Sequence, residues 1–573
     1  MTHAASEDPA GAELSLVGTR DEAPLVPGAR RRLYAFAFAA VLLLAFAVRL
    51  WVALANPEVS PDGAYYYLPL AEAIAEGRPL PARHVEVPPL YFVLAGDLAR
   101  VLRDVELSAR LVSVAGGMLA CIFVFLLARF LMGPYVAVVA MSLLAFHPYQ
   151  VTHSAETGVD ALGVAWFCAT AYALTRYAVR PRGVTALAIG CCAALLALTR
   201  VEGAFFLPLL LGIMLYLPRG GPVSWRRRAM HGALMLLLFF LAVWPRLQQV
   251  HAATGWWVID TRQVTQPLRL LRKYLAPQET STSDFPRPVR VAVAGSVTAA
   301  ADAQESVGAK VQPPHRSDAL LRILPRWKRR ARAFLSSLGP ATFFLGIYAL
   351  VRRGRRAMRE EWASGLMALA SFAAMSLGMV VSRRYSLSIG AVWQMWGAAG
   401  LLFLLRWLFA APLKRVWPRA LDLGTSPLIV TLAVALPLLQ ILAVPGRLDH
   451  PQHEGYRAMG AWIMENLGEG QRIAASRRFL AWYARAEHVE LPGARACQQW
   501  RPGDFWRYAR AQRAQFILVD PDAARWGPRL HEALASGGLA GGRVVHEVNT
   551  QAGKFFLIAV PAGEISASGG TPP

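Results

Sequence analysis

The sequence predicts a polytopic α-helical membrane protein with about eleven transmembrane helices, followed by a small extracytoplasmic α/β domain at the C-terminus. Of its 573 residues, 55% are hydrophobic and 17% are charged, and the mean hydropathy is +0.35. Soluble domains seldom combine these values. Several apolar runs approach the ~20 residues that cross a bilayer. The end of the chain instead alternates helical and strand patterns, as small α/β domains do.

Eleven apolar runs predict the spans. The first begins too late and runs too long for a cleaved signal peptide. Very short connections near 130–134 and 199–203 leave the count open by two in either direction. The predicted spans are 33–55, 107–130, 134–152, 158–179, 184–199, 203–218, 231–248, 336–352, 362–382, 387–409 and 426–444. They predict one transmembrane domain over 30–445, preceded by a disordered cytoplasmic tail, 1–29, that is rich in small and polar residues.

Basic residues alternate between the connections, and this alternation predicts the orientation. With the N-terminus in the cytoplasm, Lys and Arg gather on the inner side, as the positive-inside rule requires. The basic stretch near the end of 251–335 lies outside, but long loops are largely exempt. The inner connections carry Arg129, Arg176, Arg180, Arg182, Arg219, Arg226, Arg227, Arg228, Arg352, Arg353, Arg355, Arg356, Arg359, Arg406, Lys414, Arg415 and Arg419.

An odd number of spans places three large segments outside: loops 56–106 and 251–335, and the tail 446–573. Transporters usually keep short loops and show paired repeats, and no repeat is visible here. The large outer segments therefore favour chemistry at the outer membrane surface.

The net charge of +23 does not indicate nucleic acid, because the basic residues lie between apolar runs, where they set topology and meet anionic lipid head groups. Membrane lipids are therefore predicted partners and nucleic acid is not. The five cysteines show neither zinc-type nor disulfide-type spacing.

The tail 446–573 differs in kind from the rest of the chain. In "EGYRAMGAWIMENL", Tyr456, Met459, Ile463 and Leu467 fall on one helical stripe. "RIAAS", "AQFILVD", "RVVHEV" and "KFFLIAV" have the composition of short strands.

The stretch "SPDGAYYYLPLAEAIAEG", residues 60–77, places a carboxylate directly after the first span. The spacing over 64–74 predicts a helix along the outer surface, with Tyr65, Tyr66 and Tyr67 at head-group level. Asp62 precedes that helix. It caps the helix, acts in catalysis, or does both, since a cap also fixes the carboxylate in place.

Other polar groups lie near the membrane, where ionisable residues cost roughly 2.5–3.5 kcal/mol or more. His84 and Glu86 precede Pro88-Pro89, and ordinary surface polarity explains them. Glu156 and Asp160 are four residues apart, which predicts a shared helix face. The helix macrodipole explains Glu156 better than the deeper Asp160. His147 and His153 lie nearby but do not form a known ligand pattern, so no metal is predicted, and a divalent cation stays open.

Basic groups on the outer side complete the pattern. Arg200 and Glu202 flank a tight connection, where they form a mutual ion pair or take part in a site. Arg383, Arg384 and Tyr385 end the ninth span, where guanidinium groups bind a substrate phosphate or reach lipid phosphate. One mechanism uses all these positions: an outer carboxylate deprotonates an acceptor hydroxyl, and arginines neutralise a phosphate that leaves on a lipid.

These motifs resemble the GT-C glycosyltransferases, in particular the branch of protein O-mannosyltransferases and aminoarabinose transferases to lipid A. "PDGAYYYLPLAEAIAEG" and "VPPLYFVLAG" resemble the first outer loop of this family, "VDALGVAWF" its acidic fourth helix, "LALTRVEGAFFLPLLL" its Leu-Thr-Arg connection, and "RRYSLSIGAVWQMWGAAGL" its Arg-Tyr segment. Two departures stand out: Asp62-Gly63 replaces the usual Asp-Glu, and Val87 stands where lipid A transferases have Lys.

The resemblance implies an inverting transferase in a bacterial inner membrane, with its site on the periplasmic face. It implies a hexose or pentose donor linked to polyprenyl phosphate and a lipid, protein or polysaccharide acceptor. Asp62 is then the catalytic base, and the substrate-binding residues are Tyr65, Tyr66, His84, Glu156, Asp160, Arg200, Glu202, Arg383, Arg384 and Tyr385. The alternatives are a lipid-linked oligosaccharide polymerase or ligase, a transporter or flippase, and an inactive scaffold.

Overall fold

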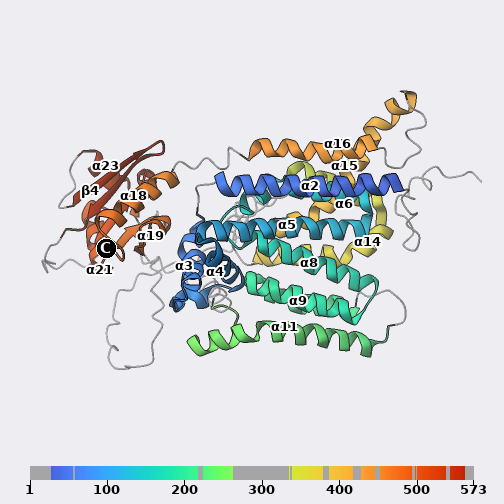
Figure 1. The fold of residues 1–573 in the computed structure, drawn as a ribbon, viewed down its shortest axis with the longest axis horizontal. Helices are drawn as coiled ribbons and strands as arrows, with labels where there is room; N and C mark the ends of the chain where they lie inside the picture. Colours follow the sequence, from blue (N-terminus) through green and yellow to red (C-terminus); the bar gives the residue numbers. More distant parts are fainter. Residues whose placement is uncertain are drawn as a thin grey trace, which may run out of the picture.

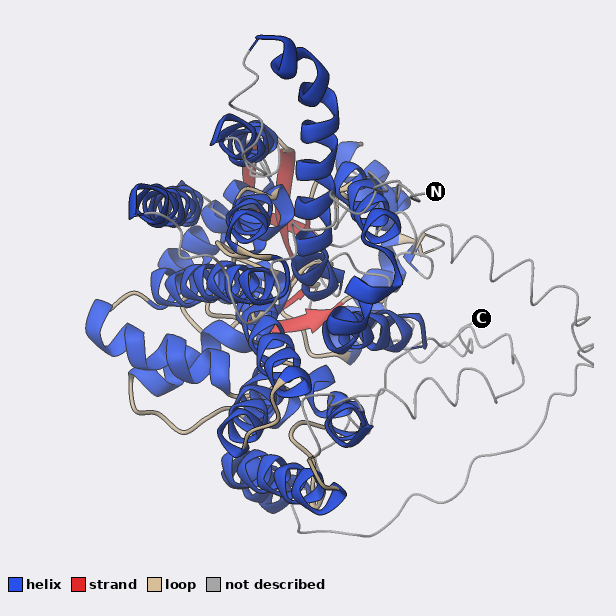
Figure 2. Cartoon of the chain, turned by 90° about the vertical axis from the view of Figure 1, so that its right-hand side faces the viewer, coloured by secondary structure: helices blue, strands red, loops and turns tan. Residues whose placement is uncertain are grey.

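The computed structural model describes residues 28–55, 59–216, 223–261, 335, 339–377, 386–416, 427–444, 452–492, 497–498, 500–536 and 542–561. Helices dominate the described residues up to 444, and a five-stranded sheet follows them. Figure 1 shows α2, α5, α8, α9 and α11 running side by side, with the small domain beside the end where α3 and α4 lie. In Figure 2 the bundle is seen end-on.

Most apolar runs form the predicted helices. Four helices in the described part are long and apolar enough to cross a membrane: Tyr34–Ala55, Val105–Met132, Trp225–Thr254 and Leu387–Phe409. Five shorter apolar helices accompany them: Pro134–Ala145, Gly183–Thr199, Gly203–Tyr216, Pro340–Arg352 and Ile429–Leu442. The count of eleven spans stays a prediction. The bundle elements are α2 (Gly28–Ala55), α5 (Val105–Met132), α6 (Pro134–Ala145), α7 (Pro148–His153), α8 (Asp160–Val179), α9 (Gly183–Thr199), α10 (Leu207–Tyr216), α11 (Trp225–Thr254), α14 (Pro340–Leu377), α15 (Leu387–Val416) and α16 (Pro427–Ala435).

Helix ends differ from the predicted limits by several residues, and in two places the division into helices also differs. The run 134–152 is split into α6 and α7 before Pro148, because the residue before a proline disfavours helical backbone angles. The predicted loop between 352 and 362 is wrong, because α14 is helical from Pro340 to Leu377. The segment "RRGRRAMREEW" is rich in Arg, Ala, Met and Glu, all good helix formers, and these continue the helix.

Arg49 is the most buried of the charged side chains described in the helices of the bundle. Arg49 of α2 is 1% exposed, and its guanidinium donates to Ala145 O at 2.7 Å and Ala45 O at 3.2 Å. Ala145 is the last residue of α6, where helical carbonyls lack intrahelical donors. Arg49 therefore caps α6 and satisfies its own charge against the negative end of that helix.

Residues 59–102, which follow α2, form a layer of short helices. Helical structure runs from Pro61 to Ala75 and includes a π turn, Gly63–Tyr67, followed by α3 (Leu68–Ala75), which confirms the predicted helix. Tyr67 was predicted at head-group level, but it is 4% exposed and packs against Tyr91. We call this element the Asp62 helix. A 3₁₀ turn, Ala82–Glu86, and α4 (Leu90–Leu102) complete the layer.

The tail forms a small mixed sheet of order β2-β1-β3-β5-β4 (red in Figure 2). Strands β1 and β2 pair in parallel, as do β1 and β3, while β5 is antiparallel to both β3 and β4. The predicted helix and four predicted strands are confirmed, and β2 was not predicted. The elements are α18 (Gln452–Asn466), β1 (Arg472–Ala475), α19 (Phe479–Tyr483), β2 (Glu487–Glu490), α21 (Pro502–Ala511), β3 (Phe516–Val519), α22 (Ala523–Trp526), α23 (Pro528–Ala535), β4 (Arg543–Thr550) and β5 (Gly553–Ala559).

Candidate active site

Asp62 lies in the first turn of the Asp62 helix, and its side chain is half-buried. The capping hydrogen bond comes from Ser60 rather than from Asp62: Gly63 N–H donates to Ser60 Oγ at 2.9 Å. With Pro61 as the first helical residue, Ser60 has the sequence context of an N-cap. The capping interpretation of Asp62 is therefore wrong, and its carboxylate is held by a helix that another residue caps.

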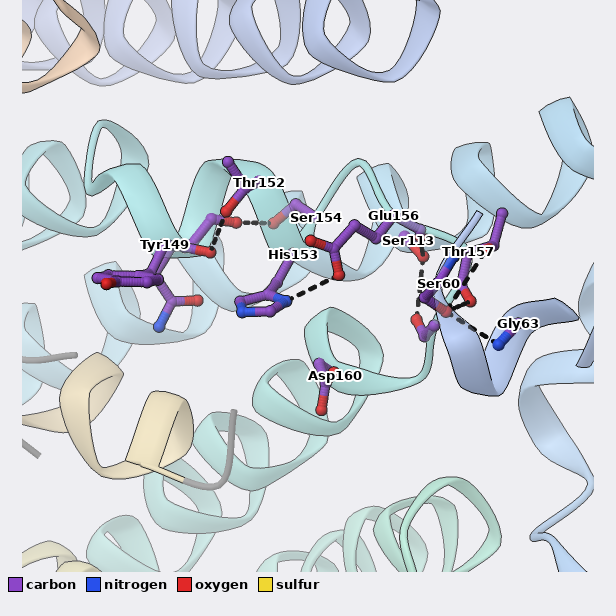
Figure 3. A network of polar contacts seen from close by, with 12 residues as sticks. Ser60, Gly63, Ser113, Tyr149, Thr152, His153, Ser154, Glu156, Thr157 and Asp160 are labelled. Atoms are coloured by element: carbon purple, nitrogen blue, oxygen red, sulfur yellow. Dashed lines mark hydrogen bonds and ion pairs between the residues drawn. The ribbon is translucent and has the colours of Figure 1, made fainter. Parts of the chain in front are cut away.

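The start of this helix is fastened to the segment between α7 and α8 (Figure 3). Ser60 Oγ donates to Thr157 O at 2.6 Å, and Ser60 N–H donates to Thr157 Oγ1 at 3.0 Å. Ser113 of α5 fixes the same segment by donating to Glu156 O at 2.6 Å. Residues that are about a hundred positions apart in sequence are therefore held together by hydrogen bonds at this end of the bundle.

Gly63 is required by this approach. A Cβ at this position would lie 2.2 Å from Thr157 Oγ1 and 2.5 Å from the Thr157 carbonyl oxygen. This contact gives a physical reason for the departure from the Asp-Glu pattern, because a larger residue after Asp62 would push the helix away from Thr157.

Asp160 and Arg200 form a nearly buried ion pair. Arg200 Nη1 lies 2.5 Å from Asp160 Oδ1, and the two side chains are 11% and 8% exposed. Gly163, one turn along α8, leaves room for the arginine, since a Cβ there would lie 2.3 Å from Arg200 Cδ. Arg200 thus reaches back to α8. The side chain of Glu202, its predicted partner, lies outside the described part of the chain.

Glu156 and Asp160 do not share a helix face, so that prediction is wrong. Helix α8 begins at Asp160, and Glu156 lies in the preceding bend because its carbonyl accepts from Gly158 N–H in a tight turn. The Glu156 carboxylate instead pairs with His153 Nδ1 at 3.0 Å (Figure 3). Asp160 occupies the first helical turn, where the macrodipole favours a carboxylate.

The aromatic residues after Asp62 are also engaged. Tyr65 and Tyr66 pack edge to face, with centroids 4.6 Å apart. The Arg83 guanidinium lies 4.8 Å from the Tyr65 ring centroid and donates to Tyr65 O at 2.8 Å. Arg478 of the tail domain lies 4.2 Å from the same centroid.

His84 shapes the loop rather than extending the polar network. Its Nδ1 lies 2.9 Å from Pro81 O, and its own carbonyl accepts from Arg246 of α11 at 2.8 Å. Burial is the main cause that lowers the pKa of His84, opposed by the Pro81 hydrogen bond and assisted by the charge of Arg246. Arg246 also donates to Val87 O at 2.8 Å, so it ties this loop to the end of α11.

Arg383, Arg384 and Tyr385 lie outside the described residues, so their predicted roles stay predictions. Within the described part, no three His, Cys, Asp or Glu residues are grouped in a way that could hold a metal ion.

Sequence reasoning missed Ser60, Thr157, Arg83 and Arg478. The Ser-Pro-Asp order is a recognisable N-cap signal and could have identified Ser60. The other three residues join the site through contacts between distant segments, for which the sequence carries no local pattern.

A helical bundle with four helices long and apolar enough to cross a membrane, a layer of short helices after the first of them, and a small terminal domain with a mixed sheet define the fold of the described residues. The comparisons confirm the resemblance drawn from the sequence. Residues 86–246 match the family model described as dolichyl-phosphate-mannose-protein mannosyltransferase. A comparison with curated protein sequences finds no match.

The solved structures with a similar fold include ArnT and AglB. ArnT from Cupriavidus metallidurans, in a structure with undecaprenyl phosphate bound, has a TM-score of 0.54 and 14% identity, and the alignment covers 92% of this chain and 98% of ArnT. The oligosaccharyltransferase AglB from Archaeoglobus fulgidus, in complex with an inhibitory peptide and a dolichol-phosphate, has a TM-score of 0.55 and 14% identity, with coverage of 93% and 75%. At this identity the likeness concerns the fold.

Proposed function

We propose that this protein is an inverting glycosyltransferase that moves a sugar from a polyprenyl-phosphate carrier to an acceptor hydroxyl at the outer face of the inner membrane. The observation that carries the proposal is the attachment of the Asp62 helix, through Ser60 and Thr157, to the segment that leads into Asp160 and its partner Arg200. The family match over 86–246 and the two lipid-phosphate complexes with the same fold support the donor class.

In the proposed reaction Asp62 accepts the proton of the acceptor hydroxyl. The acceptor oxygen then bonds to the anomeric carbon as the bond from that carbon to the phosphate oxygen breaks, which inverts the configuration. General-base catalysis of this kind contributes about 10²–10⁴-fold. The rest of the acceleration comes from positioning and charge stabilisation.

Arg200 is the proposed cation for the leaving phosphate. Its guanidinium suits phosphate oxygens because it offers a planar fork of donors that stays charged. Asp160 holds that fork in place at 2.5 Å. Glu202, Arg383, Arg384 and Tyr385 remain proposed members of the same site, and Tyr65, Tyr66, His84 and Glu156 remain proposed substrate contacts. The orientation with residues 446–573 outside is part of the proposal.

The test is Asp62→Asn in the full-length protein, purified in detergent. The substrates are synthetic undecaprenyl-phosphate hexoses and pentoses with a membrane extract as acceptor, and the measurement is the release of undecaprenyl phosphate. We expect the rate to fall by about 10²–10⁴-fold, because a carboxamide cannot accept the proton. Asp97→Asn is the matched control: Asp97 lies on α4 in the same outer loop and pairs with Arg100, and its side chain is 54% exposed. Wild-type turnover in Asp62→Asn, or no consumption of any donor by the wild type, contradicts the proposal.

A further inference from the structure

The tail domain packs directly on the helix that carries Asp62. Helix α19 contacts the π turn Gly63–Tyr67. Tyr67 and Leu68 belong to the same hydrophobic core as Phe479 and Leu480 of α19, and all four are buried. The apolar core is therefore continuous across the junction of the two parts.

Polar contacts reinforce this junction. Glu106, near the start of α5, accepts from Arg457 at 2.8 Å and from the Trp482 indole at 2.9 Å, both in the tail domain. Glu106 also accepts a hydrogen bond from Arg110 Nη2 of its own helix at 3.3 Å. A carboxylate with three charged or polar donors holds the tail domain against the outer loop.

One contact of this junction joins Arg478 of the tail domain to Tyr65 of the Asp62 helix. Arg478 follows β1 at the carboxyl edge of the parallel strands, where its Nη2 is fixed by Glu490 at 2.9 Å. From there its guanidinium lies 4.2 Å from the centroid of Tyr65, three residues after Asp62. Arg83 approaches the same ring at 4.8 Å. Attraction between each guanidinium group and the ring restrains the Tyr65 side chain.

The backbone at this point needs external support. A π turn is rare and leaves one extra residue in the turn, and Leu68 N–H closes this one onto Gly63 O. The Ser60–Thr157 contacts hold its beginning, and the guanidinium groups on Tyr65 hold its middle. Asp62 lies between these two attachments.

We propose that Arg478 is a positioning residue: acting through the ring of Tyr65, the tail domain sets the orientation of the Asp62 carboxylate. The inference rests on the proposed function, because it assigns Arg478 to the same reaction. In this proposal Arg478 acts on the reaction through the Tyr65 ring.

Two substitutions of Arg478 and one control substitution of the preceding residue test this role in the full-length protein. Arg478→Gln removes the cation, Arg478→Lys keeps a positive charge over the ring, and Arg477→Gln is the matched control. Arg477 is the preceding residue, 51% exposed, and pairs with Asp522 at 3.6 Å. The measurements are kcat and KM for the polyprenyl-phosphate donor, and hydrogen exchange of amides 63–67.

We expect Arg478→Gln to lower kcat by about 5- to 30-fold. The KM for the donor should stay within about twofold, because Tyr65, a proposed substrate contact, is kept and only the restraint on its ring is lost. Exchange of amides 63–67 should accelerate in the same variant. Arg478→Lys should recover most of kcat, and Arg477→Gln should match the wild type. In a Tyr65→Leu background Arg478→Gln should have no further effect, since the ring is gone.

Equal kcat and equal exchange in Arg478→Gln and Arg477→Gln overturn the inference while leaving the proposed function intact. An inactive wild type overturns the proposed function, and the exchange measurement then still decides whether Arg478 orders the turn. A rise in KM at unchanged kcat also overturns the inference, because it assigns Arg478 to substrate binding.

Discussion

Gly63→Ala tests whether the contact between the Asp62 helix and Thr157 organises the site. The added methyl would lie 2.2 Å from Thr157 Oγ1, 2.5 Å from Thr157 O and 2.8 Å from Ser60 Oγ. A hydroxyl can rotate away, but the carbonyl belongs to the backbone and cannot. The helix must therefore move by roughly 1 Å to reach an ordinary carbon–oxygen separation.

That displacement has two costs. Forcing a methyl into a filled contact typically destabilises a protein by about 1–3 kcal/mol. Losing the two Ser60–Thr157 hydrogen bonds, at 2.6 and 3.0 Å, adds about 1 kcal/mol each. We expect a loss of about 3–5 kcal/mol in stability. We also expect about 10²-fold lower kcat, because a shift of this size in a catalytic group costs that much.

The assay compares thermal unfolding in detergent and release of undecaprenyl phosphate for Gly63→Ala and Gly212→Ala. Gly212 lies in α10, where an added Cβ meets nothing within 4 Å. Alanine is favoured over glycine inside a helix, so this control should be neutral or stabilising. If Gly63→Ala has the melting temperature and the kcat of the wild type, the reasoning about the Thr157 contact is refuted.

Two further predictions concern charge. Asp160→Asn should destabilise the protein by about 3–5 kcal/mol, because it leaves the nearly buried Arg200 without its carboxylate. The double variant Asp160→Asn, Arg200→Gln should recover part of the lost stability in thermal melts. A wild-type melting temperature for Asp160→Asn alone would contradict the prediction. Burial lowers the pKa of His488 to about 4, against a hydrogen bond to Ala475 O that raises it. Between pH ~6.5 and 4 the histidine is therefore protonated in the unfolded chain and neutral in the folded protein. The contribution of His488 to stability is present above pH ~6.5 and falls, by about 3 kcal/mol at most, toward pH 4. His488→Gln should lose less stability than the wild type between pH 7.5 and 5, and an identical loss would rule out this assignment.

The sequence by itself determined the membrane class and most helices, because hydrophobic runs and their periodicity are local properties. It also predicted the surface helix after Pro61 and the α/β character of the tail, including strands such as "AQFILVD" that become β3. It identified Asp62, Asp160 and Arg200 as unusual because each is a charge close to an apolar run. It could not predict the continuation of α14 through its arginine-rich middle, where charge pattern and helix propensity conflict.

Only the tertiary structure decided which of these groups meet. Arg200 pairs with Asp160 of another helix, Ser60 takes the capping role assigned to Asp62, and Gly63 fits against Thr157. It also brought Arg478, more than 400 residues along the chain, onto Tyr65. The physical reason is that such contacts depend on how the helices pack in the bundle and on how the tail domain packs against the short helices that follow α2. No spacing within one segment encodes them.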